Sequence, residues 1–180
     1  MEIEKKGLEK IPKNLPVIPT IDVVIFPHMI VPLLVVDERI IKGIDRAIEK
    51  NKLIFLIASK NQTENQNGAI STTDLYGIGT IATIMRVVQL PEGGVKILVQ
   101  GVAKARASDI TSDDNILIAH LEELETAENK DEQQLEAHMR NIKKLAEEMC
   151  DGGQTLSPDF TVLLSKMTDP DKIADFVISH

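Results

Sequence analysis

Side chains that could carry out chemistry are scattered along this sequence. Ser165 and Lys166 are the types of a nucleophile and its base, but they are adjacent on a predicted helix. Neighbours on a helix point about 100° apart, so these two do not face each other as such a pair must. One acidic stretch contains four carboxylates that could act in pairs, and they are Glu122, Glu123, Glu125 and Glu128. A run of charges of this kind is typical of a solvated protein surface. Neither group predicts a catalytic site.

Metal and phosphate sites are also not indicated. The chain has a single cysteine, Cys150, and four histidines without the spacing of paired ligands, which are His28, His120, His138 and His180. No glycine-rich loop is followed by Lys-Ser or Lys-Thr, so a phosphate-binding loop of that type is not predicted. We therefore expect neither a metal nor a cofactor in this chain.

Composition and charge narrow the classes of partner. The net charge of −8 repels phosphate backbones, and only 3% of residues are aromatic, so few bases could stack. Nucleic acid is therefore not an expected partner. The apolar stretch "VVIFPHMIVPLLVV" (23–36) is shorter than a membrane helix and contains Pro27 and Pro32. With no secretory signal and a single cysteine, the chain is expected to be cytoplasmic and not membrane-bound.

The elements that would position these residues begin with short strands. Apolar runs predict strands at 15–21, 31–36 and 52–58, and the prolines place a bend near Pro27 and His28. Asp37 is a candidate N-cap for a helix whose apolar face is Ile40, Ile41, Ile44, Ala47 and Ile48. The polar segment 59–74 predicts a long exposed loop.

A long hairpin follows. Segments 76–90 and 95–107 flank "PEGG", whose glycines suit a hairpin turn, and 116–124 continues as a further strand. In the second arm, apolar or small residues alternate with Lys96, Gln100, Lys104 and Arg106, which predicts one solvent-exposed face. The expected class is α+β, with a small closed or half-closed antiparallel β-barrel over residues 1–124.

Residues 125–180 form a predicted helical subdomain. The apolar positions of its first helix recur every three to four residues and are Leu135, Met139, Ile142, Leu145, Ala146 and Met149. Gly152 and Gly153 would end that helix, and the pairs Ser157–Pro158 and Asp169–Pro170 would start two more. Because no stop signal precedes His180, we expect a helical bundle truncated at its C-terminal end.

Apolar residues also surround the bend and the hairpin. Phe26, Met29 and Ile30 lie at the bend, while Met85, Val87, Val88 and Leu90 approach the hairpin tip. For any single residue the plain interpretation is packing in the barrel core. Together they could form an exposed apolar patch, and methionine suits surfaces that accept varied partners.

Four blocks of the sequence resemble a known family. "LPVIPTIDVVIFPHMIVPLLVV", "AIEKNKLIFLIASK", "DLYGIGTIATIMRVVQLPEGGVKILVQGVAKAR" and "LSPDFTVLLSKMTDPDKIADFVISH" are together similar to the N-terminal region of the ATP-dependent protease Lon. The resemblance covers nearly the whole chain. It implies a PUA-like β-barrel followed by helices. It also implies that the ATPase module, with its ATP and magnesium, and the Ser–Lys peptidase module lie downstream, so this part should have no catalytic activity.

The role that the resemblance implies is capture of unfolded or degron-bearing proteins, together with self-association of subunits into a homohexamer. The predicted substrate contacts are Pro27, His28, Met29, Met85, Val88 and Leu90. Two alternatives remain open. One is a purely structural oligomerisation domain, in which the patch is a subunit interface. The other is a stand-alone PUA-like RNA-binding module, against which the charge of −8 and the scarcity of aromatic residues count.

Overall fold

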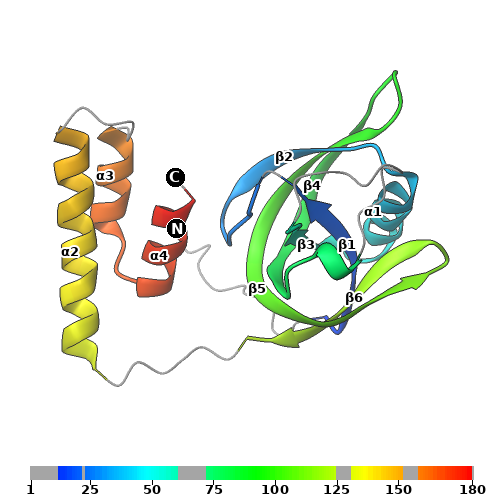
Figure 1. Ribbon diagram of the computed structural model, residues 1–180. Helices are drawn as coiled ribbons and strands as arrows, with labels where there is room; N and C mark the ends of the chain where they lie inside the picture. Colours follow the sequence, from blue (N-terminus) through cyan, green and yellow to red (C-terminus); the bar gives the residue numbers. More distant parts are fainter. Residues whose placement is uncertain (1–11, 22, 61–71, 125–130, 152–157, 180) are drawn as a thin grey trace. The chain divides into compact units, whose positions relative to one another are not determined.

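The computed structural model describes residues 12–21, 23–60, 72–124, 131–151 and 158–179 (Figure 1). The chain divides into two compact units, Met1–Leu124 and Glu125–His180. Among the described residues, the first unit holds all the strands and α1, and the second holds helices α2 to α4. The predicted α+β class is confirmed.

Six strands build the first unit, and five of them close into a ring. They are β1 (Asn14–Thr20), β2 (Ile30–Val35), β3 (Leu53–Ala58), β4 (Ile78–Gln89), β5 (Val95–Asp113) and β6 (Ile116–Glu123), and a short helical turn, η1 (Thr72–Asp74), precedes β4. The order is β2-β5-β4-β3-β1-β6, and β6 also pairs with β5. This second pairing closes the ring and leaves β2 at an open edge, beside β5 (Figure 1).

One pairing differs from the predicted antiparallel sheet. β1 and β3 run parallel, with Val17 opposite Phe55. A parallel pair needs a long connection, and here β2 and α1 lie between the two strands in the chain. The sequence signals identified the strands but not this crossover. The segment 61–71 of the predicted loop lies outside the described residues.

The core is largely aliphatic and divides into two clusters that lie on opposite faces of β3. One contains Ile44 of α1 together with Ile97 and Val99 of β5, and the other surrounds Phe55, which is completely buried. Residues of β5 that point inward, such as Val95, alternate with outward residues such as Lys96. The predicted two-residue period of this arm therefore describes its two faces correctly.

Helix α1 (Glu38–Lys50) begins at Asp37, as predicted. The Asp37 carboxylate accepts a hydrogen bond from the backbone N–H of Arg39 at 2.8 Å, which caps the helix. It also pairs with the Arg39 guanidinium at 2.7 Å. This charge-assisted bond lowers the pKa of Asp37 and raises that of Arg39. Ile44 and Ala47 are buried beneath the helix.

The helical unit contains α2 (Glu132–Asp151), α3 (Pro158–Lys166) and α4 (Pro170–Ile178). Its core includes Phe160, which stacks on Phe176 with ring centroids 4.9 Å apart. The predicted cap of α4 is correct, because Asp169 accepts from the backbone N–H of Asp171 at 3.0 Å. Gly152, Gly153 and Ser157 lie outside the described residues. None of the described helices has both the length and the apolar character needed to cross a bilayer.

The Asp37 cap generates a pH prediction. We expect Asp37→Ala to lower the free energy of unfolding by about 1 kcal/mol at neutral pH, whereas Asp37→Asn keeps the cap and loses only the charge. The pKa of Asp37 is lowered in the folded state, so its charge stabilises the fold above the unfolded-state pKa. That contribution disappears as pH falls through the folded-state pKa.

Urea unfolding checks this prediction. The stability difference between the wild type and Asp37→Asn should shrink as the pH falls below about 5 and through the lowered folded-state pKa of Asp37. A stability difference that does not change with pH would contradict the ion pair between Asp37 and Arg39.

Candidate functional site

The bend at residues 26–29 is fastened to β5. His28 has a left-handed backbone, with φ of 72°, and its N–H donates to the Gly101 carbonyl at 2.9 Å. The N–H of Gly101 donates in return to the Met29 carbonyl at 2.9 Å. A Cβ on Gly101 would collide with the Phe26 carbonyl oxygen, so only glycine permits this approach.

The three predicted contact residues at the bend differ in exposure. His28 is exposed and Pro27 is half-buried. Met29 is also half-buried and packs against the core cluster that contains Ile97. Its sulfur accepts a hydrogen bond from the Phe26 N–H at 3.2 Å. The Met29 side chain therefore fixes the bend, and only part of it is left for a partner.

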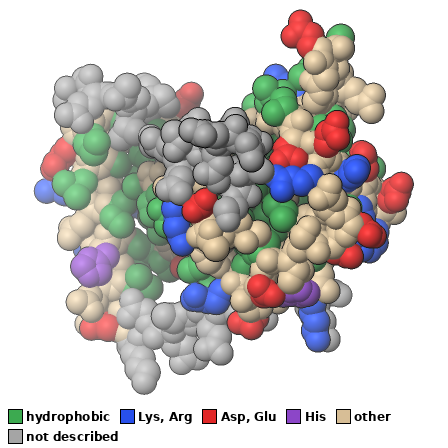
Figure 2. All heavy atoms as spheres, turned by 45° about the vertical axis from the view of Figure 1, so that its right-hand side comes forward, with side chains coloured by type: hydrophobic (Ala, Val, Ile, Leu, Met, Phe, Trp, Pro, Cys, Tyr) green, Lys and Arg blue, Asp and Glu red, His purple; other side chains and the backbone are tan. Residues whose placement is uncertain are grey.

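The other three predicted residues lie towards the end of β4. Met85 sits at a β-bulge between Ile84 and Arg86 and is 51% exposed, and Val88 is 42% exposed. Leu90 is half-buried at the turn, where its N–H donates to the Gly94 carbonyl at 3.1 Å. Figure 2 shows apolar side chains just below the tip of this hairpin.

The register separates the bend from the hairpin tip. The bend is at Gly101 of β5, to which His28 bonds. The hairpin tip is near Lys96 of β5, which pairs with Val88 on one side and with Leu34, at the far end of β2, on the other. Five residues of strand span about 17 Å. The bend and the tip are therefore separated along the strands, and an apolar surface that includes both must also contain the residues of β2 between them. Whether these six residues contact a substrate stays a prediction.

An exposed apolar surface nevertheless exists, and it is centred on β2. Ile30 is 54% exposed and Leu34 is 66% exposed, while the alternate residues Val31 and Leu33 pack against the core. Leu98 lies between Pro32 and Arg86 across the three strands. We call this surface the outer face and define it as Ile30, Pro32, Leu34, Met85, Arg86, Val88, Lys96 and Leu98.

Sequence reasoning predicted none of the β2 residues on this face as a substrate contact, although it named Ile30 among the apolar residues at the bend. Both alternating sets of β2 are apolar, so the pattern does not indicate which set faces solvent. Pro32 was the available signal, because a proline inside a strand is confined to an edge.

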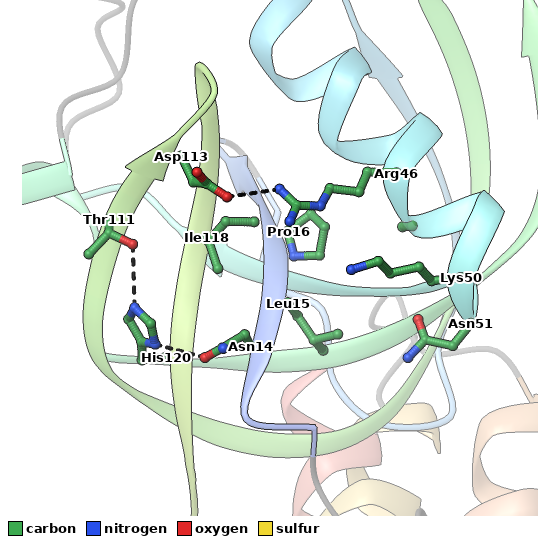
Figure 3. Close-up of a pocket in the computed structure, with 11 residues that line it drawn as sticks. Asn14, Leu15, Pro16, Arg46, Lys50, Asn51, Thr111, Asp113, Ile118 and His120 are labelled. Atoms are coloured by element: carbon green, nitrogen blue, oxygen red, sulfur yellow. Dashed lines mark hydrogen bonds and ion pairs between the residues drawn. The ribbon is translucent and has the colours of Figure 1, made fainter.

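A separate cavity of about 330 Å³ lies between α1 and strands β1, β5 and β6 (Figure 3). On its β side, His120 Nδ1 lies 2.7 Å from Oδ1 of Asn14, and Nε2 lies 3.4 Å from the Thr111 hydroxyl. On the helix side, Arg46 pairs with Asp113 at 3.1 Å, and Lys50 lies nearby. This grouping could not be predicted from the sequence, because strand pairing brings Asn14 and His120 together.

The Thr111 hydroxyl, the His120 imidazole and the Asn14 amide follow one another like the nucleophile, base and orienting group of a catalytic triad. However, 3.4 Å exceeds the reach of an efficient base, and a neutral Asn14 cannot stabilise an imidazolium as a carboxylate does. We interpret the three side chains as a polar tie between β1, β5 and β6. Among the described residues, no group of three or more His, Cys, Asp or Glu side chains could hold a metal ion.

Comparison with known proteins connects this fold to a family. The model of the ATP-dependent protease La (LON) substrate-binding domain matches residues 14–180. The chain belongs to this Lon substrate-binding domain family. The predicted relationship to Lon is thereby confirmed.

Relatives and a solved structure agree with the Lon assignment. The chain is 39% identical to Lon protease 2 of Bdellovibrio bacteriovorus over 181 residues, which is 100% of this chain and 22% of that protein. It is 32% identical to the Lon protease of Escherichia coli, covering 93% of this chain and 21% of that one. The chain thus spans about a fifth of the length of these curated relatives.

The fold is similar to the N-terminal domain of Mycobacterium avium complex Lon protease. The TM-score is 0.67 at 23% sequence identity, over 91% of this chain and 80% of that one. At this identity the likeness concerns the fold alone.

The contact of Gly101 with the bend can be tested in this Lon domain. We expect Gly101→Ala to destabilise the chain by about 2 kcal/mol, because the new methyl group would push the Phe26 carbonyl away and break both hydrogen bonds of the bend. Gly77→Ala is the matched control, since nothing lies within 4 Å of a Cβ there. Urea midpoints of the two variants measure the difference. Equal midpoints would show that the bend is not held in this way.

Proposed function

We propose that this chain captures unfolded or degron-bearing polypeptides for an ATP-dependent Lon protease through its outer face. ATP hydrolysis, with its ATP and magnesium, and peptide-bond cleavage are assigned to other parts of the full-length protein, so this chain itself has no catalytic role. The observation that supports the proposal is the exposure of Ile30, Leu34, Met85 and Val88 on a domain whose family is described as substrate-binding.

The geometry refines the predicted contact residues. Met85 and Val88 belong to the outer face, and Leu90 borders it at the turn. Pro27 and His28 lie at the other end of β2, where they form a second, smaller contact. Met29 contributes mainly by holding the bend. The proposed primary contacts are therefore Ile30, Leu34, Met85 and Val88.

An aliphatic surface suits substrates that share exposed apolar segments rather than one sequence. Met85 is flexible and polarizable, so it can pack against varied side chains. Each contact would be weak, and several copies acting on one substrate would raise the overall affinity. The proposed assembly is a homohexamer of the full-length protein in the cytoplasm. A chain whose single cysteine can form no internal disulfide suits that reducing setting.

A binding experiment tests the proposal. The probe is fluorescein-labelled, reduced and carboxymethylated lactalbumin, which is permanently unfolded. Replacing Met85 and Val88 together with aspartate should raise its Kd at least about tenfold, because two apolar contacts become charged groups that resist desolvation. Fluorescence anisotropy measures the change.

The matched control is Ile48→Asp, which adds a charge at an exposed apolar residue of α1, outside the outer face. It should change Kd by less than about twofold. A double variant that binds the probe as well as the wild type would refute the proposed site.

A further inference from the structure

The edge of β2 that faces away from β5 carries backbone groups with which no described strand pairs. Among the described helices and strands, only β5 packs extensively against β2, and no strand pairs with its other side. The hydrogen bond from Gly101 to the Met29 carbonyl directs the peptide groups of odd-numbered residues, such as Val31 and Leu33, towards β5. The peptide groups of Ile30, Pro32 and Leu34 therefore point away from β5.

Pro32 agrees with this assignment. A proline has no N–H to donate, so within a strand it is tolerated where that group would face away from the sheet. The open edge therefore offers two N–H donors, from Ile30 and Leu34, and carbonyl acceptors from all three residues. An extended chain satisfies such groups in series, as in strand addition to a sheet edge.

The side chains around this edge indicate what kind of segment fits. Val31 and Leu33, on the inner side, pack against the core and are still half-buried, so apolar residues of an added strand would extend that layer. On the outer side, Arg86 and Lys96 are exposed and form no ion pair among the described residues. Lys96 lies on β5, two strand spacings or about 10 Å from an added strand, which is close to the screening length at physiological salt. Arg86 lies on β4, one spacing farther at about 14 Å, so Lys96 provides most of the attraction for an acidic side chain on the added strand.

We propose that β2 binds substrate by strand addition, and that it prefers an extended segment in which apolar residues alternate with acidic ones. The inference rests on the proposed function and specifies how that function recognises its substrate. Apolar side chains of the segment face inward beside Val31 and Leu33. On the outer side, the methylene groups of its acidic side chains lie beside Ile30 and Leu34 while their carboxylates extend towards Lys96. Its backbone bonds to the peptide groups of Ile30 and Leu34.

Three variants separate backbone from side-chain recognition. Leu34→Pro and Leu34→Ala both remove the isobutyl group of leucine, but only the first also removes an N–H from the open edge. Pro32→Val adds an N–H there without disturbing the pairing with β5. The probe is a fluorescein-labelled peptide in which valine and glutamate alternate, and its counterpart has lysine in place of glutamate.

We expect Leu34→Pro to bind the acidic peptide about fivefold more weakly than Leu34→Ala, and Pro32→Val to bind it about fivefold more tightly than the wild type. The wild type should prefer the acidic peptide to the basic one, and high salt should remove this preference. Hydrogen exchange followed by NMR should show that the peptide protects the amides of Ile30 and Leu34. Circular dichroism shows whether each variant is folded. If Leu34→Pro does not fold, Pro32→Val still tests the inference.

Three results would overturn the inference. If peptide and unfolded lactalbumin bind without protecting Ile30 and Leu34, and the proline variant equals the alanine variant, recognition uses side chains alone and the proposed function stands. If sedimentation shows a dimer in which these amides are already protected, the edge belongs to a second copy. If neither probe binds the wild type, the proposed function fails as well.

Discussion

The architecture of the first unit depends on β5, because two different strands pair in succession along one of its edges. One edge pairs with β4, while the other pairs first with β2, from Val95 to Gln100, and then with β6, from Ala105 onwards. Gly101 lies at the changeover, where the bend at His28 crosses the strand within hydrogen-bonding distance. Because β5 turns from β2 to β6 at this point, the ring closes without β2. The same constraint that completes the core therefore leaves one strand with an open edge.

Local signals in the sequence were sufficient for most elements. Alternation identified the strands, the side-chain chemistry of Asp37 and Asp169 marked two helix starts, and the glycines of the turn located the hairpin. Properties that depend on pairing could not be predicted in this way. The parallel register of β1 and β3 follows from a crossover that periodicity does not encode. Likewise, His120 meets Asn14 from 106 residues away, through strand pairing alone.

The candidate site shows the same division between local and non-local information. Met85 and Val88 were predicted as contacts because apolar residues near a turn are hard to bury, and both are exposed. Met29 was predicted on the same grounds, but its side chain packs against the core because the bend folds back onto β5. Neither Ile30, which was named only among the apolar residues at the bend, nor Leu34 was predicted as a contact, since in a strand that is apolar on both faces only the neighbouring elements determine which face is covered.

An open apolar edge is a hazard as well as a binding site, because it can pair with another copy of the same chain. Two features limit this risk. Pro32 removes the central donor, so an added strand gains fewer hydrogen bonds than at an uninterrupted edge. The net charge of −8 makes copies of the chain repel one another, while Arg86 and Lys96 keep the surroundings of the edge locally positive. If β2 binds substrate as proposed, these features favour weak pairing with foreign segments over pairing between the β2 edges of two copies.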